Sequence, residues 1–79
     1  MGVMRSDLTT ADFSGADLTG ANLRKAKLIR ATLTGANLTG CDLSLAELSG
    51  ANFQKISGRD AIKGLDQAKF RDEATFDPR

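Results

Sequence analysis

Large apolar residues recur at every fifth position over most of the chain, without a gap. A small residue stands two positions before each of them, and the position between the two is usually Asp or Asn. Ser or Thr and then Gly commonly follow the large residue. The large residues are Leu8, Phe13, Leu18, Leu23, Leu28, Leu33, Leu38, Leu43, Leu48 and Phe53.

A spacing of five does not suit either regular secondary structure. Five steps along an α-helix rotate a side chain by about 140°, and five steps along a straight strand reverse its face, so either element would expose half of the apolar set. If the chain instead bends by a right angle after each unit, every large residue faces one axis and four units close a square coil. The sequence therefore predicts an all-β solenoid, a parallel β-helix of about two and a half coils over residues 6–55.

The repeating units read ADFSG, ADLTG, ANLRK, ATLTG and ANLTG. Consecutive units of this kind resemble the pentapeptide-repeat family. The resemblance implies a right-handed quadrilateral β-helix, but it says little about biochemical role, since many family members have none assigned. Departures fall at outward positions, where Lys25, Arg30, Leu45 and Lys55 replace the common Gly, a residue that eases turns because it tolerates positive φ.

The pattern predicts different structures at the two ends of this domain. We expect residues 1–5 to be a disordered N-terminus. After Lys55, Gly58 and Lys63 occupy the slots of the next two large residues, so the apolar core should stop growing there. Residues 56–79 are expected to form a C-terminal cap of degenerate repeats and one or two short helical turns, with a disordered tail as the alternative. The cap would lay four side chains across the open coil: Ile62, Leu65, Phe70 and Phe76.

The N-terminal end has too few preceding residues for a comparable cap. The first coil should therefore expose unpaired strand edges together with Leu8, Phe13 and Leu18. An open end of this kind favours stacking against a second copy. We expect a homodimer through this face.

Composition excludes several classes of function. The chain has 79 residues with 11 Lys+Arg against 10 Asp+Glu, a balance that is not typical of nucleic-acid binding. One cysteine and no histidine leave no disulfide, metal or cofactor motif and no catalytic constellation, so we expect a buried structural Cys41 and no enzyme activity.

No stretch is apolar enough to span a bilayer, and we expect a cytoplasmic protein. Gly2 matches a loose myristoylation pattern that is frequent by chance.

One group of outward residues combines positive charge with apolar side chains. Arg24, Lys25, Ile29, Arg30 and Leu45 are predicted to crowd one corner and to form an interaction patch; the alternative is a solvated basic surface. The leading functional hypothesis is a non-enzymatic structural or protein–protein interaction module with an unknown protein partner. The second hypothesis is a DNA-mimicking gyrase-interacting protein, which short length and near-zero net charge disfavour.

Overall fold

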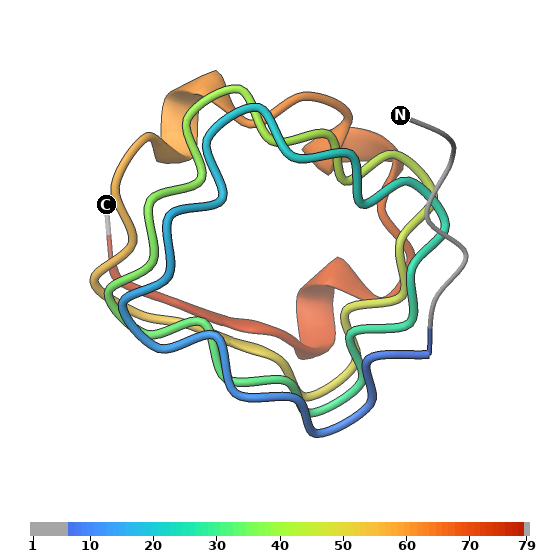
Figure 1. Ribbon diagram of the computed structural model, residues 1–79. Helices are drawn as coiled ribbons and strands as arrows, with labels where there is room; N and C mark the ends of the chain where they lie inside the picture. The colour runs from blue at the N-terminus through green and yellow to red at the C-terminus, as the bar shows by residue number, and fades with distance from the viewer. Residues whose placement is uncertain (1–6, 79) are drawn as a thin grey trace.

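The computed structural model describes residues 7–78. Between residues 7 and 57, the chain repeats one five-residue conformation, in which a bridge residue at the Asp/Asn position is followed two residues later by a two-residue turn. Seen along the coil axis, successive windings overlie one another around a common centre (Figure 1). The expected disordered segment 1–5, which includes Gly2, lies outside the described residues.

Parallel bridges join each coil to the next. Asp7 pairs with Lys27, Lys27 with Glu47, and the other sides follow the same spacing up to the pair of Asn37 with Ser57. The predicted twenty-residue coil is therefore observed over this part of the chain. Figure 1 shows successive windings of the chain lying over one another along the sides of the coil.

The corners between Leu8 and Ala51 are hydrogen-bonded β-turns. In the first one, the Ala11 amide donates to the Leu8 carbonyl at 3.0 Å, and Thr10 has a φ of 63°. Positive φ at the third turn residue is the type II pattern. The Asp/Asn side chain supports the turn, because Asp17 Oδ1 accepts hydrogen bonds from the Thr19 amide at 3.1 Å and hydroxyl at 2.6 Å. The Asp/Asn and Ser/Thr preferences of the repeat thus follow from local hydrogen bonding.

The apolar core lies on the coil axis. Leu28, Leu33, Leu38, Leu43, Leu48 and Phe53 are 0% exposed, as are Cys41 and the small inward residues Ala26, Ala36, Ala46 and Ala51. Burial of each large side chain contributes about 1.5–3 kcal/mol relative to exposure. Leu8, Phe13 and Leu18 in the first described coil are only half-buried, so their burial is less complete than that of the large side chains in the later coils.

Beyond Ser57 the units lengthen from five residues to six. Three 3-10 helices, η1 (Arg59–Ala61), η2 (Leu65–Gln67) and η3 (Arg71–Glu73), take up the added residues. The bridges shift accordingly to Asp42 with Lys63, Glu47 with Lys69, and β1 (Asn52–Phe53) with β2 (Thr75–Phe76). The neighbour of Cys41 in the next coil is therefore Ile62 and not Ala61, which lies twenty positions after Cys41.

The last fully buried core residue is Phe53, as expected from the loss of the five-residue pattern after Lys55. Ile62, Leu65, Ala68, Ala74 and Phe76 pack against the core, and the Phe76 ring stacks on Phe53 with centroids 4.9 Å apart. The packing of Ile62, Leu65 and Phe76 agrees with the predicted lid. The lid prediction was wrong for Phe70, which is 53% exposed.

Candidate interaction surfaces

Cys41 lacks the environment of a reactive thiol. It is fully buried among apolar side chains. Burial, together with the nearby Asp42 charge, raises the pKa of the Cys41 thiol to about 11. The thiolate is the nucleophilic form, so Cys41 acts as a small core residue. Within residues 7–78, no cluster of His, Cys, Asp and Glu is arranged to hold a metal ion.

The outward carboxylates of the repeat are engaged in local turns. Hydrogen bonds from Thr9, Ser14 and Thr19 lower the pKa of Asp7, Asp12 and Asp17, respectively. These carboxylates therefore remain ionised and tied to the backbone, and they hold the corners in shape.

The structure divides the five residues of the predicted patch between two successive corners. Arg24, Lys25 and Leu45 lie at one corner, because the Lys25 amide donates to the Ser44 carbonyl of the coil below. Ile29 and Arg30 lie at the next corner, above Ser49 and Gly50. We call these the Lys25 corner (residues 24, 25, 44 and 45) and the Arg30 corner (residues 9, 10, 29, 30, 49 and 50).

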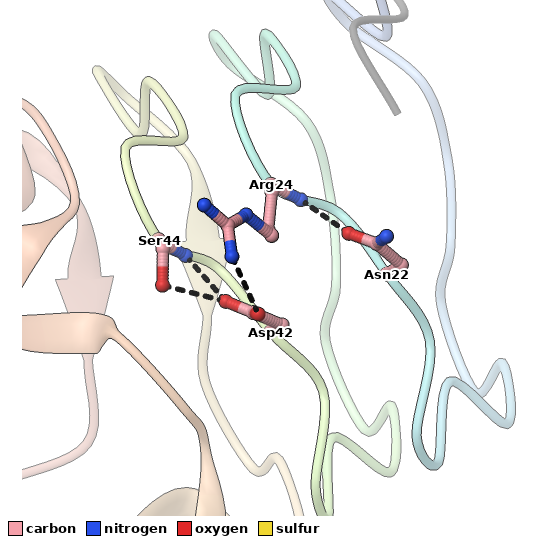
Figure 2. A network of polar contacts seen from close by, with 4 residues as sticks. All are labelled: Asn22, Arg24, Asp42 and Ser44. Carbon is pink, nitrogen blue, oxygen red and sulfur yellow. Dashed lines mark hydrogen bonds and ion pairs between the residues drawn. The ribbon is translucent and has the colours of Figure 1, made fainter. Parts of the chain in front are cut away.

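Arg24 turns away from the other patch residues. Its guanidinium approaches Asp42 at 3.9 Å, on the side that precedes the Lys25 corner, while its amide donates to Asn22 (Figure 2). Asp42 also accepts hydrogen bonds from the Ser44 amide and hydroxyl. Because the Arg24 side chain is 45% exposed, this ion pair contributes at most about 1 kcal/mol to the free energy of unfolding.

The side of the coil between the two corners brings together residues that are distant in sequence. Its central column is Asp7, Lys27, Glu47 and Lys69, joined by bridges. We call this the basic side, comprising the column, both corners and Phe70. Leu45 and Phe70, the exposed large apolar residues among those described, flank it, with exposures of 39% and 53%. Within the described part of the chain, the Lys25 and Arg30 side chains make neither ion pairs nor hydrogen bonds.

Sequence reasoning placed Phe70 in the lid and so missed it as a surface residue. The Leu48 amide donates a hydrogen bond to the Lys69 carbonyl, and the Gly50 amide donates one to the Glu73 carbonyl. Phe70 therefore lies beneath Ser49, two coils below Ile29. The sequence does indicate the position of Phe70. Asp60, Asp66 and Asp72 recur every six residues, and counting in units of six gives Phe70 the same position in its unit as Gly58 and Gly64.

The N-terminal end of the coil is a second apolar surface. A hollow of about 460 Å³ opens there, lined by Leu8, Phe13, Leu18, Gly20, Ala21, Asn22 and Leu23. The prediction that Leu8, Phe13 and Leu18 share one face is consistent with this placement, because all three line the same hollow.

The C-terminal end is hollowed too, but it is polar and partly occupied by its own contacts. A space of about 400 Å³ is lined by Arg59, Asp60, Leu65, Arg71, Asp72 and Phe76. The Arg59 guanidinium covers the Phe76 ring at 4.6 Å and donates to the Asp77 carbonyl at 2.9 Å. These contacts close the C-terminal end of the coil.

No helix within residues 7–78 has the length and apolar character needed to cross a membrane.

Comparison with known proteins identifies the repeat. The family profile described as pentapeptide repeats matches eight copies over residues 6–44 and 26–57. The crystal structure of a pentapeptide repeat protein, Rfr23, from the cyanobacterium Cyanothece 51142 is 30% identical and superposes with a TM-score of 0.74, covering 87% of this chain and 46% of that one. A pentapeptide repeat protein from the Arabidopsis thaliana thylakoid lumen is also 30% identical, with a TM-score of 0.42 and coverage of 94% and 60%.

This chain thus spans about half the length of the Rfr23 chain. No curated protein sequence matches it significantly. Pentapeptide repeat proteins are generally non-enzymatic and fold into right-handed quadrilateral β-helices. With the profile match covering most of the chain and the bridges following the same coil, the predicted resemblance is confirmed, and the chain belongs to the pentapeptide-repeat family.

Proposed function

We propose that the chain is a non-enzymatic protein-interaction module that presents its basic side to another protein. The observation that carries this proposal is the gathering of Leu45 and Phe70 with uncommitted cations on one side of the coil. Exposed apolar groups beside positive charge are typical of partner sites. The rigid turns hold these side chains in fixed positions, which lowers the entropy lost on binding.

A DNA-mimicking gyrase binder is the weaker candidate. Such a mimic needs an extended negative surface, whereas the chain has a net charge of +1 and its basic side carries Lys25, Lys27, Arg30 and Lys69. A supercoiling assay tests it: inhibition of gyrase by the purified chain would favour mimicry over the proposed interaction module.

Affinity capture from the source cell tests the main proposal. The bait is compared with a variant in which Arg24, Lys25, Ile29 and Arg30 are serine. A control variant carries Lys55→Ser and Lys63→Ser, which remove cations from other sides of the coil, and circular dichroism checks that both variants stay folded. Loss of a specific partner in the patch variant alone supports the proposal, whereas equal capture by all three proteins contradicts it.

A second proposed role is self-association through the N-terminal end. The apolar hollow of about 460 Å³ supports it, since an apolar surface of this kind favours contact with a matching surface. Sedimentation velocity should give a dimer mass at high micromolar concentration, and Phe13→Asp should convert it to a monomer without loss of β-structure. A monomer mass for the unsubstituted chain would overturn the proposal.

We also propose that the protein works in the cytoplasm. The single cysteine is buried and unpaired, in keeping with a reducing compartment. Fractionation of source cells with an antibody against the chain tests this location.

A further inference from the structure

Phe70 occupies a backbone position that suits glycine. The three six-residue units open with Gly58, Gly64 and Phe70, whose φ values are 75°, 72° and 59°. Each residue precedes a 3-10 helix and an Asp at the second helical position. Left-handed backbone costs free energy for a residue with a Cβ and little for glycine. The repeat therefore has a glycine solution that Phe70 does not use.

The fold gains little from the Phe70 ring in return. The side chain is 53% exposed, and it is not among the residues that pack on the core. Its carbonyl accepts the Glu73 amide at 3.0 Å, a backbone bond that glycine would also make. A residue that breaks a local folding rule without structural compensation is expected at a functional site.

Other residues of this kind gather around the same side. Six described non-glycine residues have positive φ, and five of them, Thr10, Lys25, Arg30, Leu45 and Phe70, flank the basic side; the sixth is Lys55. At the two opposite corners, glycine fills the corresponding positions at Gly15, Gly20, Gly35, Gly40 and Gly58. The corners of the basic side keep Gly50 and Gly64. Side chains still replace glycine at most of the positions that border this surface, but at only one, Lys55, of the opposite positions.

We infer that Phe70 is the apolar anchor of this surface and that its partner is an acidic protein segment carrying apolar side chains. The inference rests on the interaction module proposed above. The partner would cover Phe70 and bring carboxylates to Lys25 and Arg30. Phe70 lies two coils below Ile29, about 10 Å away at the usual spacing of neighbouring strands, so one short segment can reach both.

The charge pattern favours a protein over a nucleic acid or an anionic membrane. Glu47 lies in the middle of the basic side between Lys27 and Lys69, and Asp66 and Glu73 lie at its C-terminal edge. A uniformly negative surface would meet these carboxylates at close range. A protein segment can place its acidic groups opposite the cations alone.

Direct binding of defined probes tests the inference. A fluorescein-labelled twelve-residue peptide of alternating Asp and Leu is titrated with the full chain and followed by anisotropy. The comparison probes are an Asp/Ser peptide of equal charge, phosphatidylserine vesicles and an oligothymidine. We expect binding of the Asp/Leu peptide, weaker binding of the other probes, and a loss of about tenfold or more in Phe70→Gly, as for truncation of an interface anchor.

A matched control separates anchoring from backbone strain. Lys55→Gly relieves the same left-handed conformation at a corner outside the basic side and should leave peptide affinity unchanged. Both glycine variants should match or exceed the unsubstituted chain in Tm. A Tm that falls in Phe70→Gly would assign the ring a structural role and overturn the inference.

Failure of this inference can be told apart from failure of the proposed function. If Lys25→Ser with Arg30→Ser weakens peptide binding while Phe70→Gly does not, the interaction side stands and the anchor is wrong. If neither variant changes binding, or if vesicles or the oligothymidine bind more tightly than the Asp/Leu peptide, both are wrong.

Discussion

Replacing Gly58 with alanine should destabilise the protein much more than replacing Gly20. Both glycines have left-handed backbone, with φ values of 75° and 68°. A Cβ at Gly20 would meet nothing within 4 Å, whereas a Cβ at Gly58 would lie 2.7 Å from both Cα and N of Thr39 and would also overlap its hydroxyl. The two substitutions therefore share one conformational cost and differ in steric overlap.

The magnitudes follow from these two contributions. The left-handed conformation costs an alanine about 1–2 kcal/mol at either site. At Gly58, the last coil must also shift away from the Thr39 backbone, and overpacking of this kind costs about 1–3 kcal/mol. We expect a loss of about 1–2 kcal/mol for Gly20→Ala and about 2–5 kcal/mol for Gly58→Ala. Each kcal/mol lowers Tm by about 4–8 °C in a domain of this size.

Urea unfolding followed by far-ultraviolet circular dichroism is the suitable assay, since the chain has no Trp or Tyr for intrinsic fluorescence. Adding Thr39→Ala to Gly58→Ala should recover only a small part of the loss, because the closest remaining contacts are to backbone atoms. Equal losses for Gly20→Ala and Gly58→Ala would refute the reasoning, and so would full rescue by Thr39→Ala.

Three further predictions concern the core and the carboxylates. Leu38→Ala should cost about 2–5 kcal/mol in urea unfolding, and Leu18→Ala clearly less, because Leu18 lines the open end. Hydrogen bonds from Ser14 keep the pKa of Asp12 below 3.8, so its stabilising contribution is present above that pH and is lost as pH falls through the folded pKa; Asp12→Asn should reduce this acid sensitivity in pH-dependent melts. Cys41 should react with Ellman's reagent at pH 8 only at the unfolding rate, since burial raises its pKa to about 11; fast reaction of the native protein would contradict this.

The coil could be predicted from sequence because its constraint is local and repeated. Apolar residues such as Leu28 and Leu48 share a column only if the chain closes after twenty residues, and the bridge of Lys27 with Glu47 shows that it does. The Asp/Asn preference also has a local cause, the bond to the amide two residues on. Each unit thus carries its own geometry in its five residues.

The C-terminal coil could not be predicted in the same way, because its register depends on inserted residues. Gly58 looks like a missing large residue when units of five are counted. In the structure it begins a six-residue unit whose 3-10 turn returns Ile62 to the core. The recurrence of Asp60, Asp66 and Asp72 indicates the longer period, but choosing it requires knowing that a coil can absorb one extra residue per side.

The interaction patch was only partly predictable, since closeness in sequence differs from closeness on a coil. Arg24 and Arg30 are six residues apart and lie at different corners, with Arg24 directed to Asp42. Phe70 is far from Ile29 in sequence and lies two coils below it at the same corner. Outward neighbours become visible only when the twenty-residue columns, and their later shifts, are known.

These relations explain where functional information can reside in a repeat of this kind. Packing determines the residue types at the inward positions, and turn hydrogen bonds determine those at the Asp/Asn positions. Neither set can therefore vary to suit a binding partner. The third turn position is different, because glycine satisfies the backbone there and any other residue costs stability. Lys25, Leu45 and Phe70 have positive φ, and so lose stability relative to glycine, at positions that flank the basic side. The opposite corners have glycine at these positions, apart from Lys55. Their distribution, more than the charge of the whole chain, is the physical reason to look for a partner on the basic side.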